Sequence, residues 1–436
     1  MSSNKSELNS SLLALDIGTE FIKCILAKPI NPDHPEKSVK FKDSLKSGRL
    51  KVLGFSKSRQ APGNMSGGAI SDIPGVVASC EEALSELEAK TGERAKTVVV
   101  GISGELVKGH TTTIRYRRDT PHKPITDSEL RELLERIESR AESKVRDELS
   151  LETDNPEVDL SLVNSALVSL SIDGYKINNP VGFKGAEVLI EYYTAFAPAI
   201  AVSAIEKVCV ELELDLLAVV VEPFAICRAC LGDEVDVDFS AVLIDVGGGT
   251  TDIAVVDSGG VCGTRMFNIA GASFTRQISE SLGVRPETAE KYKIHLEDED
   301  ILSDTIISKT TGALNRSLAV WLAGVQLALE EFKNVSPLPA DIFLSGGSSS
   351  LLPLEELLAT SDWYAGLPFD RRPLVHLLDP YSLPDFILPD AGSDDSLALD
   401  GSFITALGLL RVAVDTLLAS PNQNSLRAKL SRLLSH

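Results

Sequence analysis

Two segments far apart in the chain share one unusual pattern, and this repeat constrains the fold more than any other feature. Residues 12–19 read LLALDIGT and residues 241–252 read AVLIDVGGGTTD, and another apolar run follows each. In both, an apolar run predicts a buried strand, and an aspartate followed by glycine and a hydroxyl residue predicts a tight turn into a returning strand. The repeat therefore predicts two similar lobes that face one ligand.

The composition is that of an ordinary globular protein and excludes several classes of function. With 436 residues, 43% of them hydrophobic and 24% charged, the chain is long enough for two to four domains with sizeable cores. Its net charge of −21 argues against general nucleic-acid binding, because phosphate neutralisation requires clustered Lys and Arg.

The cysteines and the N-terminal residues indicate in which cellular compartment the protein is expected. Six cysteines are scattered, and the one close pair, Cys227 and Cys230, has no second pair to complete a zinc site. We expect free thiols and a reducing compartment. Residues 1–11 lack the layout of a signal peptide, and no apolar run reaches the ~18–20 residues of a membrane span. The expected location is the cytoplasm.

The order of apolar runs and turns predicts an α/β protein with interleaved lobes. The first lobe is expected over 11–103 and 195–235, completed by a returning helix at 401–418. A small strand-and-helix module is expected at 104–194, inserted into the first lobe, with a helix that begins at a Thr126–Glu129 capping box. The second lobe is expected over 236–270 and 333–400, with a helical subdomain at 271–332 and a linker and helix at 419–436. Residues 362–395 are predicted to form a large surface loop.

The two predicted turns have the chemistry of a phosphate and metal site. Glycines let backbone N–H groups approach phosphate oxygens without a Cβ in the way, and hydroxyl and ammonium groups add donors. This set consists of Gly18, Thr19 and Lys23 in the first hairpin and Gly247, Gly248, Gly249, Thr250 and Thr251 in the second. Asp16 and Asp245 are expected to face each other and hold Mg²⁺ through its water molecules.

Three further segments are candidates for the same cleft. Glu222 ends a predicted strand and precedes a proline-started helix; it is either a surface acid near a helix start or the group that orients an attacking water. Glu290 and Lys293 are either an ordinary charged helix face or a pair that reaches a ribose. A buried strand ends at Ser345, Gly346 and Gly347 and supplies a third glycine turn.

In combination these motifs resemble the actin-like ATPase superfamily. The Asp16 and Asp245 hairpins, the Glu222–Pro223 strand end and the Ser345–Gly347 strand end match its phosphate, connecting and adenosine motifs. Within the superfamily the chain is similar to the FtsA family of bacterial cell-division proteins over about residues 11–418. That similarity rests on segments such as Ser66–Asp72, Gly101–Gly104 and Glu222–Ala225, and on the place of the inserted module.

The resemblance implies a fold and a function beyond what the residues show by themselves. It implies two duplicated ribonuclease-H-like lobes around a cleft that binds ATP and Mg²⁺, filament formation, at most slow ATPase activity, and attachment of the tubulin-like protein FtsZ to the membrane at the division site. By position, Glu290, Lys293, Gly346 and Gly347 hold the nucleoside, and the FtsZ C-terminal peptide binds within about 271–331.

The C-terminal residues form a candidate membrane helix. Leucines at i, i+4, i+7 and i+8 share one helical face with basic residues around them, and no acidic residue follows Asp415. These positions are Leu426, Arg427, Lys429, Leu430, Arg432, Leu433 and Leu434. The pattern suits an anionic bilayer and equally a helix docked on its own body or on a partner; the family resemblance favours the membrane.

Two other functions remain compatible with these motifs. One is that of PilM, a related pilus-assembly protein that binds a short peptide of an inner-membrane partner. The other is an ATP-dependent small-molecule kinase, which requires a general-base aspartate in a substrate pocket between the lobes. The sequence contains no good candidate for that aspartate outside the nucleotide motifs.

Overall fold

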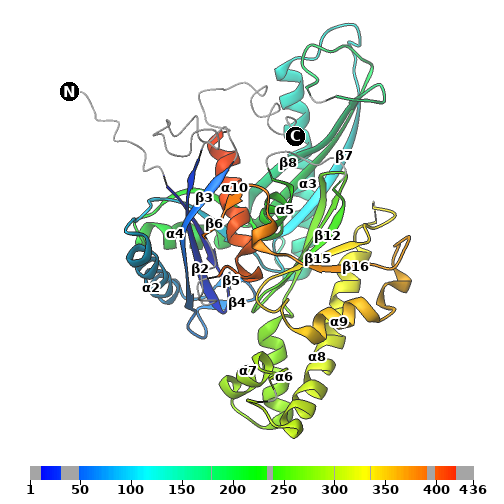
Figure 1. Ribbon diagram of the computed structural model, residues 1–436. Coiled ribbons are helices and arrows are strands. Elements are labelled where there is room, and N and C mark those ends of the chain that lie inside the picture. Colours follow the sequence, from blue (N-terminus) through cyan, green and yellow to red (C-terminus); the bar gives the residue numbers. More distant parts are fainter. Residues whose placement is uncertain are drawn as a thin grey trace, which may run out of the picture.

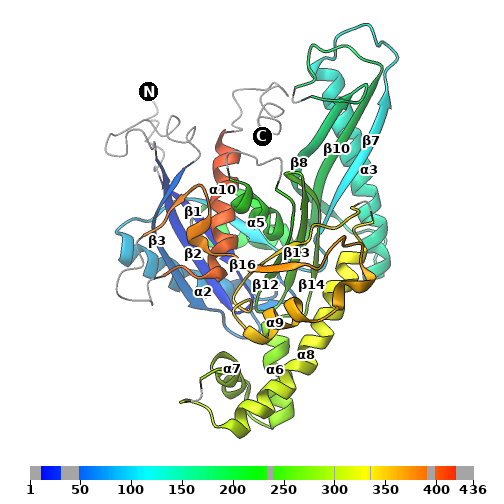
Figure 2. The same cartoon turned by 45° about the vertical axis from the view of Figure 1, so that its right-hand side comes forward.

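The computed structural model describes residues 11–30, 49–177, 179–232, 239–298, 300–333, 335–389 and 398–418. Its core consists of two twisted sheets with two helices between them (Figures 1 and 2). These inner helices are α5 (Glu222–Leu231) and α10 (Ile404–Leu418). Helix α10 packs on the first sheet, and α5 packs on α10 and on the second sheet.

The first sheet has six strands in the order β11-β6-β1-β2-β3-β17. In chain order these are β1 (Leu12–Ile17), β2 (Phe21–Pro29), β3 (Leu50–Arg59), β6 (Thr97–Ile102), β11 (Asp215–Val221) and β17 (Phe386–Ile387). Helices α2 (Ile73–Thr91) and α4 (Ala199–Glu211) contact this sheet and each other, and a short hairpin of β4 (Met65–Ser66) and β5 (Ala69–Ile70) precedes α2. Strands β1 and β6 are buried along almost their whole length and consist mainly of apolar residues, as expected for strands covered on both faces.

The second sheet has nine strands in the order β16-β15-β12-β13-β14-β7-β10-β8-β9. Its first five strands are β12 (Ala241–Val246), β13 (Thr251–Asp257), β14 (Gly260–Phe267), β15 (Asp341–Ser345) and β16 (Leu374–Leu377). Helices α6 (Gly271–Leu282), α7 (Pro286–Ile294) and α8 (Asp304–Glu330) extend below it, and α9 (Leu352–Thr360) contacts β16 and α8 (Figure 1).

The other four strands come from the segment predicted as an inserted module. They are β7 (Lys108–Arg117), β8 (Leu160–Ile172), β9 (Tyr175–Lys176) and β10 (Glu187–Pro198), with helix α3 (Asp127–Thr153) packed along them. Although the segment follows β6 of the first sheet in the chain, β7 pairs with β14 of the second sheet at His110 and Gly263. The module therefore extends the second sheet and projects from the body (Figure 2).

Most predicted elements are confirmed. Both glycine hairpins form, the strand at 97–102 has the expected bounds, and the predicted helix at 74–91 is α2. The capping box at α3 is confirmed in its first half, because Thr126 accepts a hydrogen bond from the N–H of Glu129. The Glu129 carboxylate instead binds the buried guanidinium of Arg118.

The prediction of a large surface loop at 362–395 is wrong where that range forms β16 and β17. Strand β16 pairs in parallel with β15, and β17 pairs in parallel with β3. One short segment is thus hydrogen-bonded into both sheets. These strands have only four and two residues, and their partners are distant in sequence, so no local pattern identifies them.

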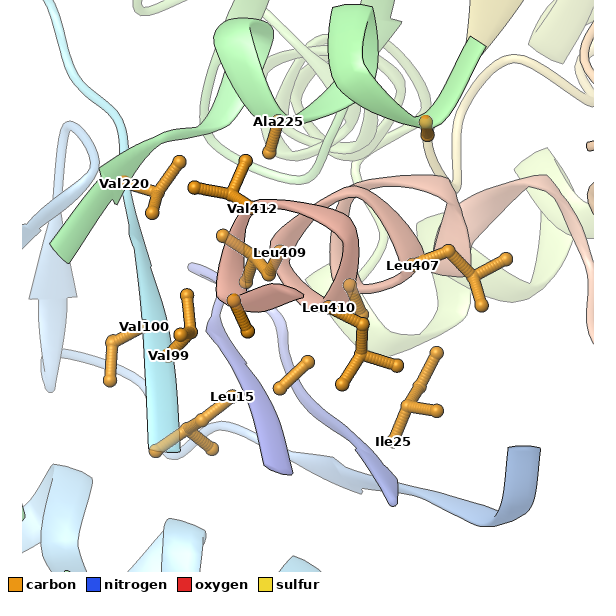
Figure 3. Close-up of a cluster of buried hydrophobic side chains, with 14 of the residues drawn as sticks. Leu15, Ile25, Val99, Val100, Val220, Ala225, Leu407, Leu409, Leu410 and Val412 are labelled. Carbon is orange, nitrogen blue, oxygen red and sulfur yellow. The ribbon is translucent and has the colours of Figure 1, made fainter. Parts of the chain in front are cut away.

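Helix α10 is the centre of the largest apolar core (Figure 3). Leu409 and Leu410 lie between the strands that carry Leu15 and Val99 and the helix that carries Ala225. Among the described residues, 401–418 is long and apolar enough to cross a membrane by composition, but 72% of it is buried inside the fold. Its burial between two layers identifies α10 as a core helix.

One buried cation interrupts this apolar helix. The Arg411 side chain is fully buried and forms salt bridges with Asp385 (3.2 Å) and Asp415 (2.7 Å). Arg228 of α5 also binds Asp415 at 2.9 Å. Burial by itself raises the pKa of Asp415, but the two guanidinium groups outweigh it and hold this pKa below its ordinary value.

Candidate functional site

The two glycine hairpins have the same turn geometry. The N–H of Gly18 donates to the carbonyl of Phe21 at 3.1 Å, and the N–H of Gly247 donates to that of Thr250 at 3.0 Å. In the strand register, Asp16 is opposite Lys23 in the first hairpin, and Asp245 is opposite Asp252 in the second. Lys23 in the first hairpin and Asp252 in the second therefore occupy equivalent positions.

The two turns approach each other so closely that only glycine fits on one side. A Cβ on Gly248 would lie 2.4 Å from Cγ of Glu20, and a Cβ on Gly249 would lie 2.4 Å from Oγ1 of Thr19. Both distances are far inside van der Waals contact. The glycines of the second turn are thus required for the hairpins to face each other.

A cavity of about 400 Å³ lies where the hairpins meet. Both sheets, α7 and the start of α10 contribute to its lining. Of the residues predicted for the site, it is lined by Asp16, Gly18, Thr19, Lys23, Glu222, Asp245, Gly247, Gly248, Gly249, Thr250, Glu290, Lys293 and Gly347. The structure brings these positions, which span more than three hundred residues of sequence, into one cleft.

Two predicted residues, Thr251 and Gly346, are not part of the lining. The Thr251 hydroxyl is fully buried, donates to the Ile269 carbonyl and accepts from the Trp321 indole. Gly346 has φ +88°, and a Cβ there would lie 2.5 Å from the Val246 carbonyl oxygen and 2.7 Å from Oδ1 of Asp245. Both positions hold the second hairpin in place from behind.

Lys23 and Asp16 form a buried ion pair at the floor of the cleft. Nζ of Lys23 lies 2.7 Å from Oδ2 of Asp16. Burial opposes the charge on Lys23, but Asp16, Asp245 and Glu222 together outweigh burial and raise the pKa of the ammonium above its ordinary value. Lys23 is therefore a permanent positive charge beside the first turn.

Asp245 lies across the cleft on β12. Its carboxylate accepts hydrogen bonds from the hydroxyls of Ser345 (2.8 Å) and Thr405 (3.3 Å). Burial raises the pKa of Asp245, and Lys23 and Ser345 partly offset that rise. A second strand end and the start of α10 thus orient this carboxylate.

The half-buried carboxyl group of Glu222 and the buried one of Asp252 lie near Asp16. Glu222 lies against Gly101, where a Cβ would lie 3.0 Å from its Oε1. Burial raises both pKa values well above the ordinary range, and the nearby carboxylates raise them further. Two carboxyl groups this close titrate as a pair rather than independently.

Asp252 was not predicted as a site residue. The signal that identifies it is the register of the second hairpin, in which it occupies the position of Lys23 in the first. Its Oδ1 atom is buried and has no hydrogen-bond partner among the described residues. A buried polar atom without a partner is uncommon in folded proteins.

Helices α6 and α7 hold the second turn from the opposite side. The N–H groups of Gly271 and Ala272 donate to the carbonyls of Gly247 and Gly248 at 3.1 and 2.8 Å. The buried Lys293 ammonium contacts Glu290 (2.8 Å) and the Gly271 carbonyl (3.1 Å). The predicted Glu290–Lys293 pair therefore exists and connects α7 to the start of α6.

Lys57 and Arg59 also line the cleft and were not predicted. Both are on β3, and Lys57 is opposite Lys23 in the β2–β3 register. The Lys57 ammonium lies 4.5 Å from the centre of the Phe21 ring and 3.4 Å from the Ser402 hydroxyl. Their identification requires the strand register, because their local sequence is that of an ordinary alternating strand.

The cleft as a whole combines backbone N–H groups, hydroxyls, ammonium groups and carboxylates. This donor set suits an anion that carries a hard cation, since carboxylate oxygens and water are the ligands that Mg²⁺ prefers and glycine-lined turns suit phosphate. The residues predicted for membrane binding, between Leu426 and Leu434, lie outside the described residues.

Two family models match the chain in sequence. The model described as "Cell division protein FtsA" matches residues 242–380, and the model described as "MreB/Mbl protein" matches residues 176–300. The FtsA match contains the second hairpin, α6 to α8 and the third glycine strand end.

Curated proteins named "Cell division protein FtsA" match over longer stretches. The Streptococcus pneumoniae protein is 24% identical over 282 residues, which are 64% of this chain and 54% of that protein. The Bacillus subtilis protein is 22% identical over 361 residues, which are 79% of this chain and 74% of that protein. The chain is a homologue of the FtsA proteins. It spans little more than half of the pneumococcal relative.

A solved structure supports the fold of this FtsA homologue. The structure titled "PilM-PilN type IV pilus biogenesis complex" superposes with a TM-score of 0.61 at 18% identity, over 92% of this chain and 98% of that one. The fold is the actin-like fold that the family resemblance implies, with two sheets that face one cleft.

Proposed function

We propose that this FtsA homologue binds ATP with Mg²⁺ in the cleft between its hairpins. The observation that carries the proposal is the contact of the two glycine turns over a floor of Lys23, Asp16 and Asp245. The turns and Lys23 would hold the phosphates, Asp16 and Asp245 the hydrated metal, and α7 and Gly347 the nucleoside. When bound, Mg²⁺ supplies positive charge that neutralises the phosphate oxygens.

We assign Glu222 the role of orienting the water that attacks the terminal phosphate. Its carboxyl group lies within the cleft, beside Asp16, Asp245 and Asp252. Burial and these neighbouring carboxylates raise its pKa above the ordinary value. Phosphoryl transfer needs little covalent chemistry from the protein, so a positioned water and charge neutralisation suffice.

The chain's role is proposed to be that of a cell-division scaffold. Its sequence relatives carry that name, and its motifs resemble those of the same family. We propose that it assembles into filaments and connects FtsZ to the cytoplasmic face of the membrane, with the FtsZ C-terminal peptide bound within 271–331.

Two binding measurements test this function and separate it from its alternatives. We expect calorimetry to show binding of ATP·Mg²⁺, and co-sedimentation to show binding of FtsZ that a peptide of its C-terminus competes away. ATP binding without FtsZ binding would favour a PilM-like role. ATP-dependent phosphorylation of a sugar or of acetate would favour a small-molecule kinase.

The substitution Gly249→Ala tests the contact between the hairpins. Because the new Cβ would lie 2.4 Å from the Thr19 hydroxyl, the turns must separate, and we expect ATP affinity to fall roughly tenfold or more. The control is Gly366→Ala, since a Cβ at Gly366 meets no atom within 4 Å. Equal ATP affinity of both variants would contradict the proposed phosphate site.

Deletion of residues 425–436 tests membrane attachment. Each buried leucine contributes at most ~1.5–3 kcal/mol and each basic residue about 1 kcal/mol near anionic lipid, so one tail should bind weakly and a filament with many tails strongly. We expect the deleted protein to stay in the supernatant of anionic liposomes while it still binds ATP. Unchanged pelleting of the deleted protein would rule out the tail as the anchor.

A further inference from the structure

The residues on both sides of Glu222 are held by the module that extends the second sheet. Before it, the N–H of Val221 donates to Oδ1 of Asn164 on β8 at 2.7 Å. Val221 is the last residue of β11, the outermost strand at its end of the first sheet. The amide of Asn164 therefore satisfies a backbone donor at a sheet edge, one residue from Glu222.

The local shape of β8 directs Asn164 toward β11. The register of β8 with β10 shifts between Ala195, which pairs with Asn164, and Phe196, which pairs with Leu162. Such a bulge places an extra residue on one strand and changes the direction of the neighbouring side chain. In a regular strand, side chains alternate between the two faces of the sheet. The bulge interrupts this alternation next to Asn164.

After Glu222, a second module residue packs against Phe224. The rings of Tyr193 on β10 and Phe224 on α5 are stacked, with centroids 5.5 Å apart and planes at 4°. Tyr193 is fully buried, and its hydroxyl shares a hydrogen bond of 3.1 Å with Thr264 on β14. Gly109 on β7 leaves the room for this hydroxyl, since a Cβ there would lie 2.5 Å from it.

We propose that Asn164 and Tyr193 are positioning residues that hold Glu222 in place for ATP hydrolysis. The inference rests on the proposed function, because it concerns the same site. Neither residue lines the cleft, so both act through the backbone and ring that flank Glu222. Stable placement matters because a displacement of about 1 Å can reduce a reaction rate by about 100-fold.

The decisive comparison is between Asn164→Ala and Asn164→Asp. Alanine removes the acceptor for the Val221 N–H, whereas aspartate keeps an oxygen at the same place. We expect Asn164→Ala to lower kcat for ATP hydrolysis about tenfold or more, with ATP affinity within about twofold of wild type, and Asn164→Asp to restore most of kcat. Amide hydrogen exchange at Val221 should be faster in the alanine variant only.

Tyr193→Phe and Ser169→Ala complete the design. Phenylalanine keeps the stacking on Phe224, so we expect kcat to fall less than in Tyr193→Leu, which removes the ring. Ser169 is also on β8 and donates to Glu191 of β10 at 2.6 Å, so Ser169→Ala disturbs the module without contact to β11. It should leave kcat unchanged.

The outcomes separate this inference from the proposed function. If the wild-type protein does not bind or hydrolyse ATP, the proposed function or the role of Glu222 fails, and the inference fails with it. If the wild type hydrolyses ATP and Asn164→Ala keeps its full kcat, only the inference is overturned. An equal loss of kcat in Asn164→Asp, or in Ser169→Ala, would also overturn it, since that pattern indicates general damage to the module.

Discussion

Glu222→Gln is expected to slow ATP hydrolysis about 100-fold or more, with ATP affinity within about twofold of wild type. Glutamine has the shape of glutamate but cannot accept a proton from the attacking water or orient it as a carboxylate does, and such a group contributes about 10²–10⁴ in rate. Single-turnover hydrolysis and calorimetric titration with ATP give the two quantities separately. An unchanged single-turnover rate would remove Glu222 from the mechanism.

The same substitution is expected to stabilise the nucleotide-free protein. The folded-state pKa of Glu222 is raised above its ordinary value of 4.5, so ionisation of the carboxyl group destabilises the fold as the pH rises above that value. Glutamine cannot ionise. We expect Glu222→Gln to raise the free energy of unfolding by about 1–2 kcal/mol at pH 7–8, and to have little effect near pH 4.

A matched control for stability is Glu290→Gln. Glu290 is partly exposed and is paired with Lys293 at 2.8 Å, so its neutralisation removes an attraction instead of a repulsion. It should not stabilise the protein at any pH. Urea unfolding of both variants across this pH range checks the sign, and a Glu222→Gln effect independent of pH would contradict the explanation by charge.

Arg411→Ala is expected to destabilise the fold by about 3–5 kcal/mol, because it removes a buried charge from between two carboxylates. Asp385 and Asp415 would then lie in the core without their shared guanidinium, although Arg228 would still contact Asp415. Urea unfolding at pH 7 measures the loss. Arg372→Ala is the control, because its salt bridge with Asp362 is exposed, and a surface pair contributes about 0–1 kcal/mol.

The pH dependence of this effect has a definite sign. The folded-state pKa of Asp415 is lowered from its ordinary 3.8, so its contribution is present above that value and disappears as the pH falls through the folded-state pKa. The difference between wild type and Arg411→Ala should therefore shrink in strong acid. A loss below 1 kcal/mol at pH 7 would show that Arg228 alone compensates both carboxylates.

The sequence predicts the hairpins and much of the cleft because that information is local. A buried strand, an aspartate and a glycine turn occur within eight residues, and the pattern occurs twice. Asp252 and Lys57 were missed because their place in the cleft depends on which residue faces which across a strand pair. Register is a tertiary property, set by the turn and by burial of one face.

The segment around β16 and β17 shows a second limit. Pro373 and Pro380 flank β16, and its few residues pair with a strand about thirty positions earlier. Neither length nor periodicity distinguishes such a strand from a loop. The inserted module shows a third limit: its chain position after β6 predicts attachment to the first lobe, whereas hydrogen bonds between β7 and β14 join it to the second sheet.

The position of α10 also determines the order in which the protein can fold during synthesis. Five of the six strands of the first sheet are complete once β11 has been made, yet the helix that covers their inner face follows roughly 180 residues later. At ribosomal speeds this interval is about ten seconds or more. Until then Leu15, Val99 and their neighbours remain uncovered on that face, so the nascent chain exposes a large apolar surface that a chaperone can bind.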